Sequence, residues 1–207
     1  MSTTHHETTD EKETGRVEAF SDGVFAIAIT LLVLELRVPH GADSDSLQEL
    51  AGQGPAFFAF FTGFATIGIM WLNHHRVFNL VRRVDHGLLL WNTLLLLGTT
   101  LVPFFMHLVS VSLGHRGDRV AAALFSANGV LTAFGYNALW HHITHPKGRP
   151  LLRVPADDPR VLEITSAYRF GAVYVIGIVV AIWNAWASVG INLALALFFA
   201  LPPRRSR

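Results

Sequence analysis

Residues 16–36 of the chain read RVEAFSDGVFAIAITLLVLEL, and this stretch decides the fold. From Gly23 onward it is apolar except for Thr30 and Glu35. A helix needs about 20 mostly apolar residues to cross the roughly 30 Å of hydrocarbon in a bilayer. The stretch therefore predicts a membrane-spanning helix whose first turns carry charged and polar side chains.

The rest of the chain repeats this alternation of long apolar runs and short polar breaks. Hydrophobic residues make up 51% of the 207 residues and charged residues 15%, whereas soluble domains carry about 25% charged residues. We expect an all-α integral membrane protein with six transmembrane helices, near 18–38, 56–79, 87–112, 120–142, 165–187 and 189–201. Ala187 to Asn192 is the expected turn between the last two helices, and a five-span arrangement stays open.

The polar ends of the chain define its expected organisation. Residues 1–15 are polar and lack the apolar core of a signal peptide, so we expect a disordered cytoplasmic tail there. Residues 16–203 form the expected six-helix domain, and residues 204–207 a basic cytoplasmic tail. Ser44 to Gln53 predicts a short helix on the outer surface, capped by Ser44 or Asp45.

Charge and cysteine content set the orientation and exclude several functions. With the N-terminus in the cytoplasm, thirteen of the sixteen Lys and Arg residues fall on the inner side, which favours cytoplasmic N- and C-termini in a multi-pass plasma-membrane protein. The formal net charge of +1 gives no indication of a nucleic-acid partner. The absence of cysteine excludes disulfides and thiolate metal sites.

A charged cluster at the inner end of the first helix is the most informative feature. A carboxylate at bilayer depth costs roughly 2.5–3.5 kcal/mol, so Asp22 needs a partner in protein or water. We expect a hydrogen-bonded network near the cytoplasmic face that comprises Ser21, Asp22, Trp71, His74 or His75, and Asn92. This network has three possible roles. It locks three helices together, it senses pH or controls gating because its histidine titrates near neutrality, or it holds a metal. Only one carboxylate lies near, which makes the metal the least favoured reading.

The same helix carries an aliphatic stripe on another face. At about 100° per residue, Ile27, Thr30, Leu31 and Leu34 fall within a band about 100° wide, away from Ser21 and Asp22. Such a stripe can face lipid, another helix or a pore, and periodicity alone does not choose among them.

The motif Arg16-x-x-x-Phe20-Ser21-Asp22, followed by GVFAIAITLLVLEL, resembles a known family. It is similar to the bacterial homologues of the endosomal and lysosomal potassium channel, transmembrane protein one-seventy-five. Trp71-Leu72-Asn73-His74-His75, Asn92 and Pro103-Phe104 support the resemblance, which covers the first three helices.

The resemblance implies a passive cation channel selective for potassium over sodium, without a TVGYG filter loop. It implies a homotetramer in which the first helix of each subunit lines the pore. Ile27 would form the constriction, Leu31 and Leu34 further aliphatic layers, and Thr30 would contribute to potassium preference. The residues implied to hold the helix in place are Arg16, Phe20, Ser21, Asp22, Trp71, Asn73, His74, His75 and Asn92. Ala26 departs from relatives with serine there, so selectivity here is expected to be modest.

The expected partners are therefore the lipid bilayer, potassium and other monovalent cations, with no cofactor and no resident metal. The alternative is a proton- or cation-coupled secondary transporter that uses Asp22 and His74 or His75. It lacks support because the sequence shows no broken helix or inverted repeat. An enzyme is not expected, because no nucleophile and base converge at one depth. We interpret His141, His142 and His145, with no acid adjacent in sequence, as part of an interfacial belt with Trp140.

Overall fold

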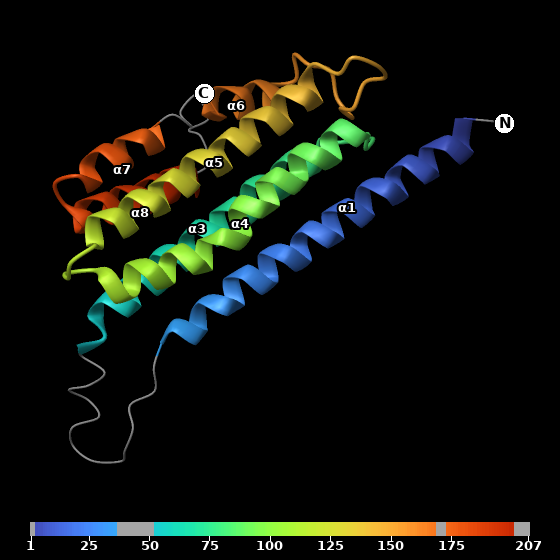
Figure 1. The fold of residues 1–207 in the computed structure, drawn as a ribbon. Coiled ribbons are helices and arrows are strands. Elements are labelled where there is room, and N and C mark those ends of the chain that lie inside the picture. Colours follow the sequence, from blue (N-terminus) through green and yellow to red (C-terminus); the bar gives the residue numbers. More distant parts are fainter. Residues whose placement is uncertain (1–2, 37–51, 169–172, 201–207) are drawn as a thin grey trace.

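The computed structural model of the chain describes residues 3–36, 52–168 and 173–200. These residues form helices, which are coloured along the chain in Figure 1. The elements are α1 (Thr3–Leu31), the short 3-10 helix η1 (Leu32–Glu35), α3 (Gly54–Phe78), α4 (His86–Ser112), α5 (Asp118–Thr144), α6 (Pro159–Tyr168), α7 (Tyr174–Ala181) and α8 (Ala185–Ala200). Within the described ranges, β pairing is limited to one bridge between Val81 and Leu152.

Three of these helices are long and apolar enough to cross a bilayer. They cover Lys12–Leu34, Gly54–Phe78 and His86–Ser112, and they coincide with the first three expected spans. Helix α5 has 27 residues and therefore the necessary length, but buried Ser126, Asn128 and Thr132 make it more polar. The all-helical fold with long apolar helices agrees with the expectation for a membrane channel.

The N-terminal segment differs from the expected disordered tail, because α1 begins at Thr3. This segment contains no proline, and its one glycine, Gly15, lies at its end, next to Arg16. Starting a helix is costly, whereas lengthening an existing helix is cheap. The membrane helix therefore extends into the polar sequence before it, and Figure 1 shows this end of α1 projecting beyond its neighbours.

The expected turn over Ala187 to Asn192 is wrong. The chain turns at Ile182 to Asn184, and α8 runs through Ala187 to Asn192. Asn184 explains the position, because its side-chain Oδ1 accepts a hydrogen bond from the Ala187 backbone N–H at 3.0 Å and caps α8.

The expected fifth span is also not one continuous helix over the described residues. Its start coincides with the end of α6, and its centre with α7. At about 1.5 Å per residue, the eight residues of α7 extend only about 12 Å. Residues 44–51 of the expected outer helix and the basic tail 204–207 lie outside the described residues.

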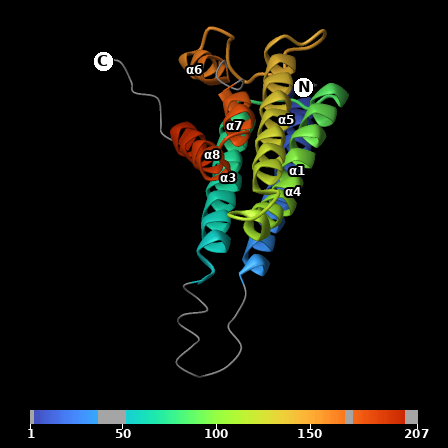
Figure 2. The same cartoon turned by 60° about the vertical axis from the view of Figure 1, so that its left-hand side comes forward.

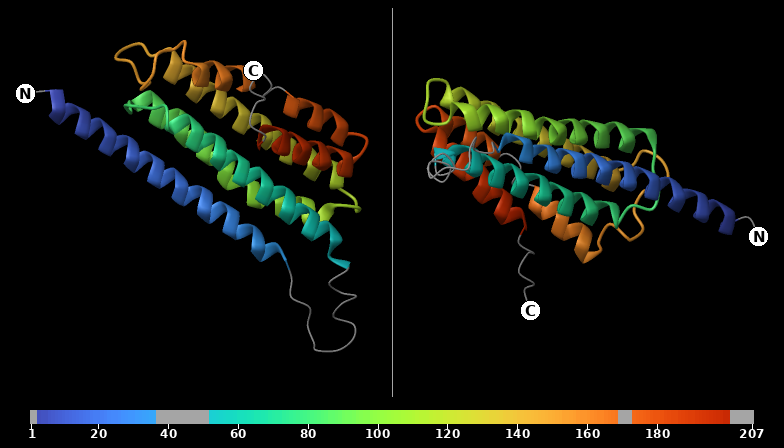
Figure 3. Two further views of the ribbon diagram at one scale, coloured as in Figure 1. Left: turned by 180° about the vertical axis from the view of Figure 1, so that it is seen from behind. Right: turned by 90° about the horizontal axis from the view of Figure 1, so that it is seen from below.

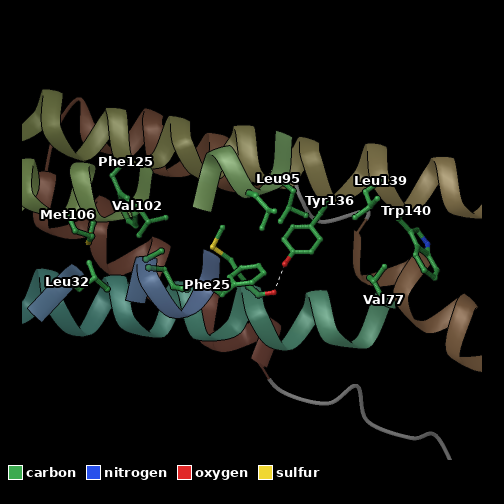
Figure 4. Close-up of a cluster of buried hydrophobic side chains, with 14 of the residues drawn as sticks. Phe25, Leu32, Val77, Leu95, Val102, Met106, Phe125, Tyr136, Leu139 and Trp140 are labelled. Carbon is green, nitrogen blue, oxygen red and sulfur yellow. Dashed lines mark hydrogen bonds between the residues drawn. The ribbon is translucent and has the colours of Figure 1, made fainter. Parts of the chain in front are cut away.

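The helices form a bundle with α1 at one edge. Helix α1 packs on α3 and α4, and α5 packs on α4, α7 and α8. Seen from behind and from below, α6, α7 and α8 lie on the far side of the bundle from α1 (Figure 3), and Figure 2 shows α5 between α4 and α7. The buried side chains labelled in Figure 4 include Phe25 of α1, Val77 of α3, Leu95 of α4 and Tyr136 of α5.

Small residues allow the close contacts between these helices. A Cβ on Gly63 would lie 2.8 Å from Met106, one on Gly129 2.7 Å from Tyr174, and one on Gly135 3.2 Å from the Leu95 backbone. These three glycines therefore serve close helix packing. A Cβ on Gly68, in the same helix as Gly63, would have no atom within 4 Å.

Candidate functional site

Helix α1 divides the candidate functional residues between two faces. Ser21, Phe25, Ala28 and Leu32 are buried, and at about 100° per residue they fall within a band about 60° wide. This band faces α3 and α4. The stripe residues lie on the other side of the helix, with Ile27 63% and Leu34 74% exposed in the single chain. The sequence motif thus combines an anchoring face with an uncovered apolar face.

A chain of hydrogen bonds links the anchoring face of α1 to both neighbouring helices. Ser21 Oγ donates to the Val17 carbonyl oxygen at 2.8 Å and accepts from Asn92 Nδ2 of α4 at 3.0 Å. Asn92 Oδ1 lies 2.9 Å from His74 Nε2 of α3. All three side chains are buried. One amide side chain therefore joins three helices.

The direction of these bonds determines the tautomer of His74. A backbone carbonyl only accepts, so the Ser21 hydroxyl proton is directed to Val17 and its oxygen accepts from the Asn92 amide nitrogen. Asn92 then presents its oxygen to His74, and His74 must donate through Nε2–H. Neutral His74 consequently carries an unprotonated Nδ1, which has no partner among the described residues.

Two aromatic rings enclose His74 in this position. The Phe78 ring stacks on the imidazole with centroids 4.2 Å apart, and Phe25 presents an edge-type contact at 5.3 Å. The His74 side chain has no solvent exposure. Its surroundings therefore combine one polar bond with apolar packing, as in a structural core histidine.

Two further contacts connect α1 with α3 beside these hydrogen bonds. Trp71 Nε1 donates to Asp22 Oδ1 at 2.9 Å, and His75 Nδ1 lies 3.0 Å from Glu18 Oε1. Trp71 and His75 also stack on each other, with centroids 6.0 Å apart. Among the hydrogen bonds of the described residues, none joins Asp22 to either histidine. The proton relay that the transporter alternative requires is thus not formed in this geometry.

Three motif residues lie outside this set of contacts. Arg16 is exposed, and no ion pair or hydrogen bond joins it to another residue in the described part of the chain. Phe20 is 66% exposed and lies on the stripe side of α1. Asn73 lines a cavity between α3, α5, α7 and α8, away from α1. The structure therefore does not bring these three into the network that the sequence suggests.

The stripe itself is apolar with one hydroxyl. Ile27, Leu31 and Leu34 are all exposed, and Thr30 is exposed between them. The Thr30 hydroxyl lies 3.0 Å from the Ala26 carbonyl oxygen and 2.9 Å from that of Ile27, both in its own helix. Its proton is directed to the backbone, so its oxygen lone pairs are the groups available to a cation.

A second polar contact lies at the α4 N-terminus, between Asp85 and His142. Asp85 accepts from the Leu88 backbone N–H at 2.7 Å and so caps α4. His142 Nε2 of α5 lies 2.8 Å from Asp85 Oδ1, and Trp140 is buried and donates to Thr165. His142 and Trp140 thus have partners within the bundle, whereas His141 and His145 are exposed and stack on each other. Partial burial raises the pKa of Asp85, but the hydrogen bonds from Leu88 and His142 outweigh it and lower that pKa below its usual value.

The contacts missed from the sequence differ in how easily they were detectable. Glu18 lies one turn before Asp22, so its approach to α3 follows from helical spacing once Asp22 is placed there. The Asp85–His142 pair spans 57 positions, and no local pattern indicates it. Within the described residues, no three His, Asp or Glu side chains gather closely enough to hold a metal ion.

Comparison with known proteins places this geometry in a family context. The family model described as the endosomal/lysosomal potassium channel TMEM175 matches residues 16–103, which contain every residue of the network above. A potassium channel of Chamaesiphon minutus is 44% identical over 199 residues, covering 94% of this chain and 97% of that protein. The human endosomal/lysosomal proton channel TMEM175 is 42% identical over 88 residues, covering 38% of this chain and 18% of that protein.

One solved structure also resembles the fold. It is the crystal structure of a lysosomal potassium-selective channel TMEM175 homologue from Chamaesiphon minutus. It superposes with a TM-score of 0.78 at 42% sequence identity, covering 91% of this chain and 97% of the other. The likeness to the bacterial relative therefore extends over nearly the whole chain, whereas the likeness to the human protein covers 38% of it.

Proposed function

Because this chain belongs to the TMEM175 family, whose matched members are ion channels rather than enzymes, we propose that it is a potassium channel. Four copies surround a common axis, and α1 of each copy lines the pore. The channel lies in the bacterial plasma membrane with both termini in the cytoplasm and six spans per subunit. It conducts potassium, and less readily sodium, down the electrochemical gradient.

One observation carries this proposal: α1 is anchored on one face and uncovered on the other. Hydrogen bonds from α3 and α4 hold Ser21 and Asp22, while Ile27 and Leu34 remain largely exposed. An exposed aliphatic row alone is compatible with lipid contact. Its combination with the family match supports placing this row at the pore.

The physical role of each stripe residue follows from four-fold symmetry. A ring of four Ile27 side chains forms a narrow apolar constriction that loses water when tight and so blocks hydrated ions. Leu31 and Leu34 extend the apolar lining toward the outer side. The lone pairs of Thr30 replace part of the hydration shell of potassium, at a greater net cost for the more strongly hydrated sodium.

The network on the other face has a structural role in this proposal. Ser21, Asn92 and His74 fix the rotation of α1 about its own axis, because each bond is directional and buried. A different rotation would turn Ile27 away from the axis. The secondary transporter is not favoured, because Asp22 bonds Trp71 and His74 bonds Asn92.

The test compares potassium and sodium flux into liposomes that contain wild type, Ile27→Asn or Ile176→Asn. Ile176 of α7 is 51% exposed and provides the same substitution away from α1. We expect potassium flux in wild type, and greater and less selective flux in Ile27→Asn, because a polar ring keeps the constriction wet. Ile176→Asn should conduct as wild type does.

Two results separate the parts of this proposal. Flux in Ile27→Asn but none in wild type means that the channel is closed at rest and still has its pore at α1. If all three well-folded samples conduct nothing, or both variants change flux equally, α1 does not line the pore.

A further inference from the structure

A positively charged loop follows α5 at one end of the bundle. Residues 145–153, the basic loop, read HPKGRPLLR and contain Lys147, Arg149 and Arg153 but no acid. Helix α5 has the length of a bilayer span and ends at Thr144, so Lys147 lies three residues beyond it. Figure 1 shows this part of the chain at the end of the bundle toward which the N-terminus of α1 projects. In the proposed six-span arrangement, the basic loop therefore lies at the level of the lipid headgroups.

Backbone hydrogen bonds hold the basic loop against the segment between α3 and α4. The Arg82 backbone N–H donates to the Leu151 carbonyl oxygen at 2.7 Å, and the Arg153 backbone N–H donates to the Leu80 carbonyl oxygen at 2.8 Å. Leu151 is also buried. The basic loop consequently has a fixed position relative to the ends of the helices, although it contains no helix or long strand.

The same pairing gathers positive charge from two distant parts of the sequence. Residues 79–84 read NLVRRV and contain no acid, and Asp85, which follows them, is held by the contacts described above. The Arg83 backbone N–H reaches the Leu151 carbonyl oxygen at 3.4 Å, so Arg82 and Arg83 lie beside the basic loop. Like charges gathered in this way repel one another, and an anion bound among them removes that cost.

Two cations of the basic loop have no counter-charge from the chain. Lys147 and Arg149 are exposed, and within the described ranges they form no ion pair or hydrogen bond. Of the acids that follow the loop, Asp158 accepts two hydrogen bonds from the Arg160 guanidinium, each at 3.0 Å. Asp157 is exposed and is not paired with either cation in this part of the structure. The charges of Lys147 and Arg149 are therefore available to an anion from outside the chain.

The basic loop is also connected to α1. Thr14 of α1 is 2% exposed, and its hydroxyl donates to the Arg82 carbonyl oxygen at 3.3 Å. The Arg82 backbone N–H bonds Leu151 on its other side. An anion that holds the basic loop in place thus also stabilises the contact of α1 with the segment between α3 and α4.

We propose that the basic loop binds the headgroup of an anionic phospholipid, with Lys147 and Arg149 contacting its phosphate group. A lipid fits this place because Lys and Arg side chains next to a membrane span are attracted to an anionic membrane surface. The proposal rests on the proposed function for the arrangement of the spans, whereas conduction of potassium has no part in it.

The test measures lipid binding to the purified full-length protein in detergent by native mass spectrometry. The probes are phosphatidylglycerol and phosphatidylcholine with the same acyl chains. Both contain a phosphodiester, but only phosphatidylglycerol has a net negative charge. We expect wild type to bind the first phosphatidylglycerol molecule roughly tenfold more tightly than the first phosphatidylcholine molecule.

Variants test the two named cations. Lys147→Gln/Arg149→Gln should bind both lipids equally, whereas Lys147→Arg/Arg149→Lys keeps the charges and should keep the preference. Arg149→Gln alone should weaken the preference several-fold. Arg116→Gln is its matched control, because Arg116 is also exposed in a loop beside a glycine, between α4 and α5. It should bind as wild type does.

Thermal unfolding gives a second measurement that needs no variant. Phosphatidylglycerol should raise the unfolding temperature of wild type more than phosphatidylcholine does, because it stabilises the loop and its contact with α1. This difference should disappear in about 1 M sodium chloride, where the Debye length is about 3 Å.

Three results would overturn the proposal. The first is an unchanged preference for phosphatidylglycerol in Lys147→Gln/Arg149→Gln, and the second is an equal loss of preference in Arg149→Gln and Arg116→Gln. The third is displacement of phosphatidylglycerol by inorganic phosphate at physiological concentration, which would assign the site to a soluble anion. Each of these results leaves the flux comparison of wild type and Ile27→Asn unaffected, so the two proposals fail separately.

Discussion

Asn92 joins three helices of the bundle through one buried side chain. Its amide nitrogen donates to α1 and its oxygen accepts from α3, while its backbone belongs to α4. No shorter or singly functional side chain replaces both bonds, because one partner offers an acceptor and the other a donor. The orientation of the amide is set by Ser21, whose proton is directed to Val17.

We predict that Asn92→Leu lowers the free energy of unfolding by about 1–2 kcal/mol, because it removes two interhelical hydrogen bonds in an apolar environment. It also leaves His74 Nε2–H buried without an acceptor. Unfolding by sodium dodecyl sulfate in mixed micelles measures the change.

Thr93→Val is the matched control for this prediction. Thr93 follows Asn92 in the same helix, is exposed, and bonds the Leu89 carbonyl oxygen of its own helix. An equal loss of stability in both variants would show that the hydrogen bonds from Ser21 through Asn92 to His74 contribute no stability of their own.

At the scale of elements, α4 and α5 are joined at the end of the bundle where α4 begins. Asp85 caps α4 and also contacts His142 in the last turn of α5. A Cβ on Gly87 would lie 2.4 Å from the His142 ring, so glycine is needed for this contact. At the same end of the bundle, the segments that follow α3 and α5 are joined by a backbone hydrogen bond. The Leu151 carbonyl oxygen accepts from the Arg82 backbone N–H at 2.7 Å.

The lowered pKa of Asp85 predicts how stability depends on pH. A carboxyl group with a lower pKa in the folded state stabilises it above the unfolded pKa of about 3.8, and this contribution is lost as pH falls through the folded pKa. Asp85→Asn retains a helix cap but loses the charge. We expect it to be less stable than wild type at pH 7 by about 0.2–1 kcal/mol.

The difference between wild type and Asp85→Asn should shrink as pH falls below about 4 and vanish once the carboxyl group is protonated in the folded state as well. Thermal unfolding of the two proteins across this range measures it. A difference that stays constant with pH would contradict the assignment, since it would arise from packing or capping alone.

At the scale of the whole molecule, the single chain leaves an apolar face uncovered. Phe20, Ile27 and Leu34 of α1 are each more than 60% exposed, and an apolar row of this kind needs lipid or protein to cover it. The proposed tetramer covers it by placing four α1 helices around one axis. Four copies of the 22.8 kDa chain correspond to a protein mass of about 91 kDa.

The absence of cysteine allows a direct test of this assembly. We predict that Ile27→Cys forms disulfide-linked pairs of subunits under oxidation, because side chains at a constriction lie within reach of one another. Ile176→Cys, exposed on α7, should remain unlinked. Non-reducing gels give the linkage, and light scattering in detergent gives the mass. A monomeric mass, or equal linkage in both variants, would argue against the proposed axis.

Much of the site was accessible from the sequence because it depends on helical periodicity. The placement of Ser21 and Asp22 on one face of α1, and of Ile27, Leu31 and Leu34 on another, follows from 3.6 residues per turn. The depth of Trp71, His74 and Asn92 follows from the lengths of two apolar runs. By contrast, Asn73 and His74 are adjacent in sequence, and only the packing shows that Asn73 lines a pocket while His74 contacts Asn92 of α4.

The sequence by itself determined the long apolar helices, the two-faced character of α1 and the motif that places the chain in its family, because these depend on local order along the chain. Only the tertiary structure decided which histidine bonds Asn92, that Glu18 faces His75, and that Asp85 meets His142. These features depend on the rotation and depth of each helix relative to its neighbours. Rotation and depth are set by close packing of many side chains at once, which no single stretch of sequence encodes.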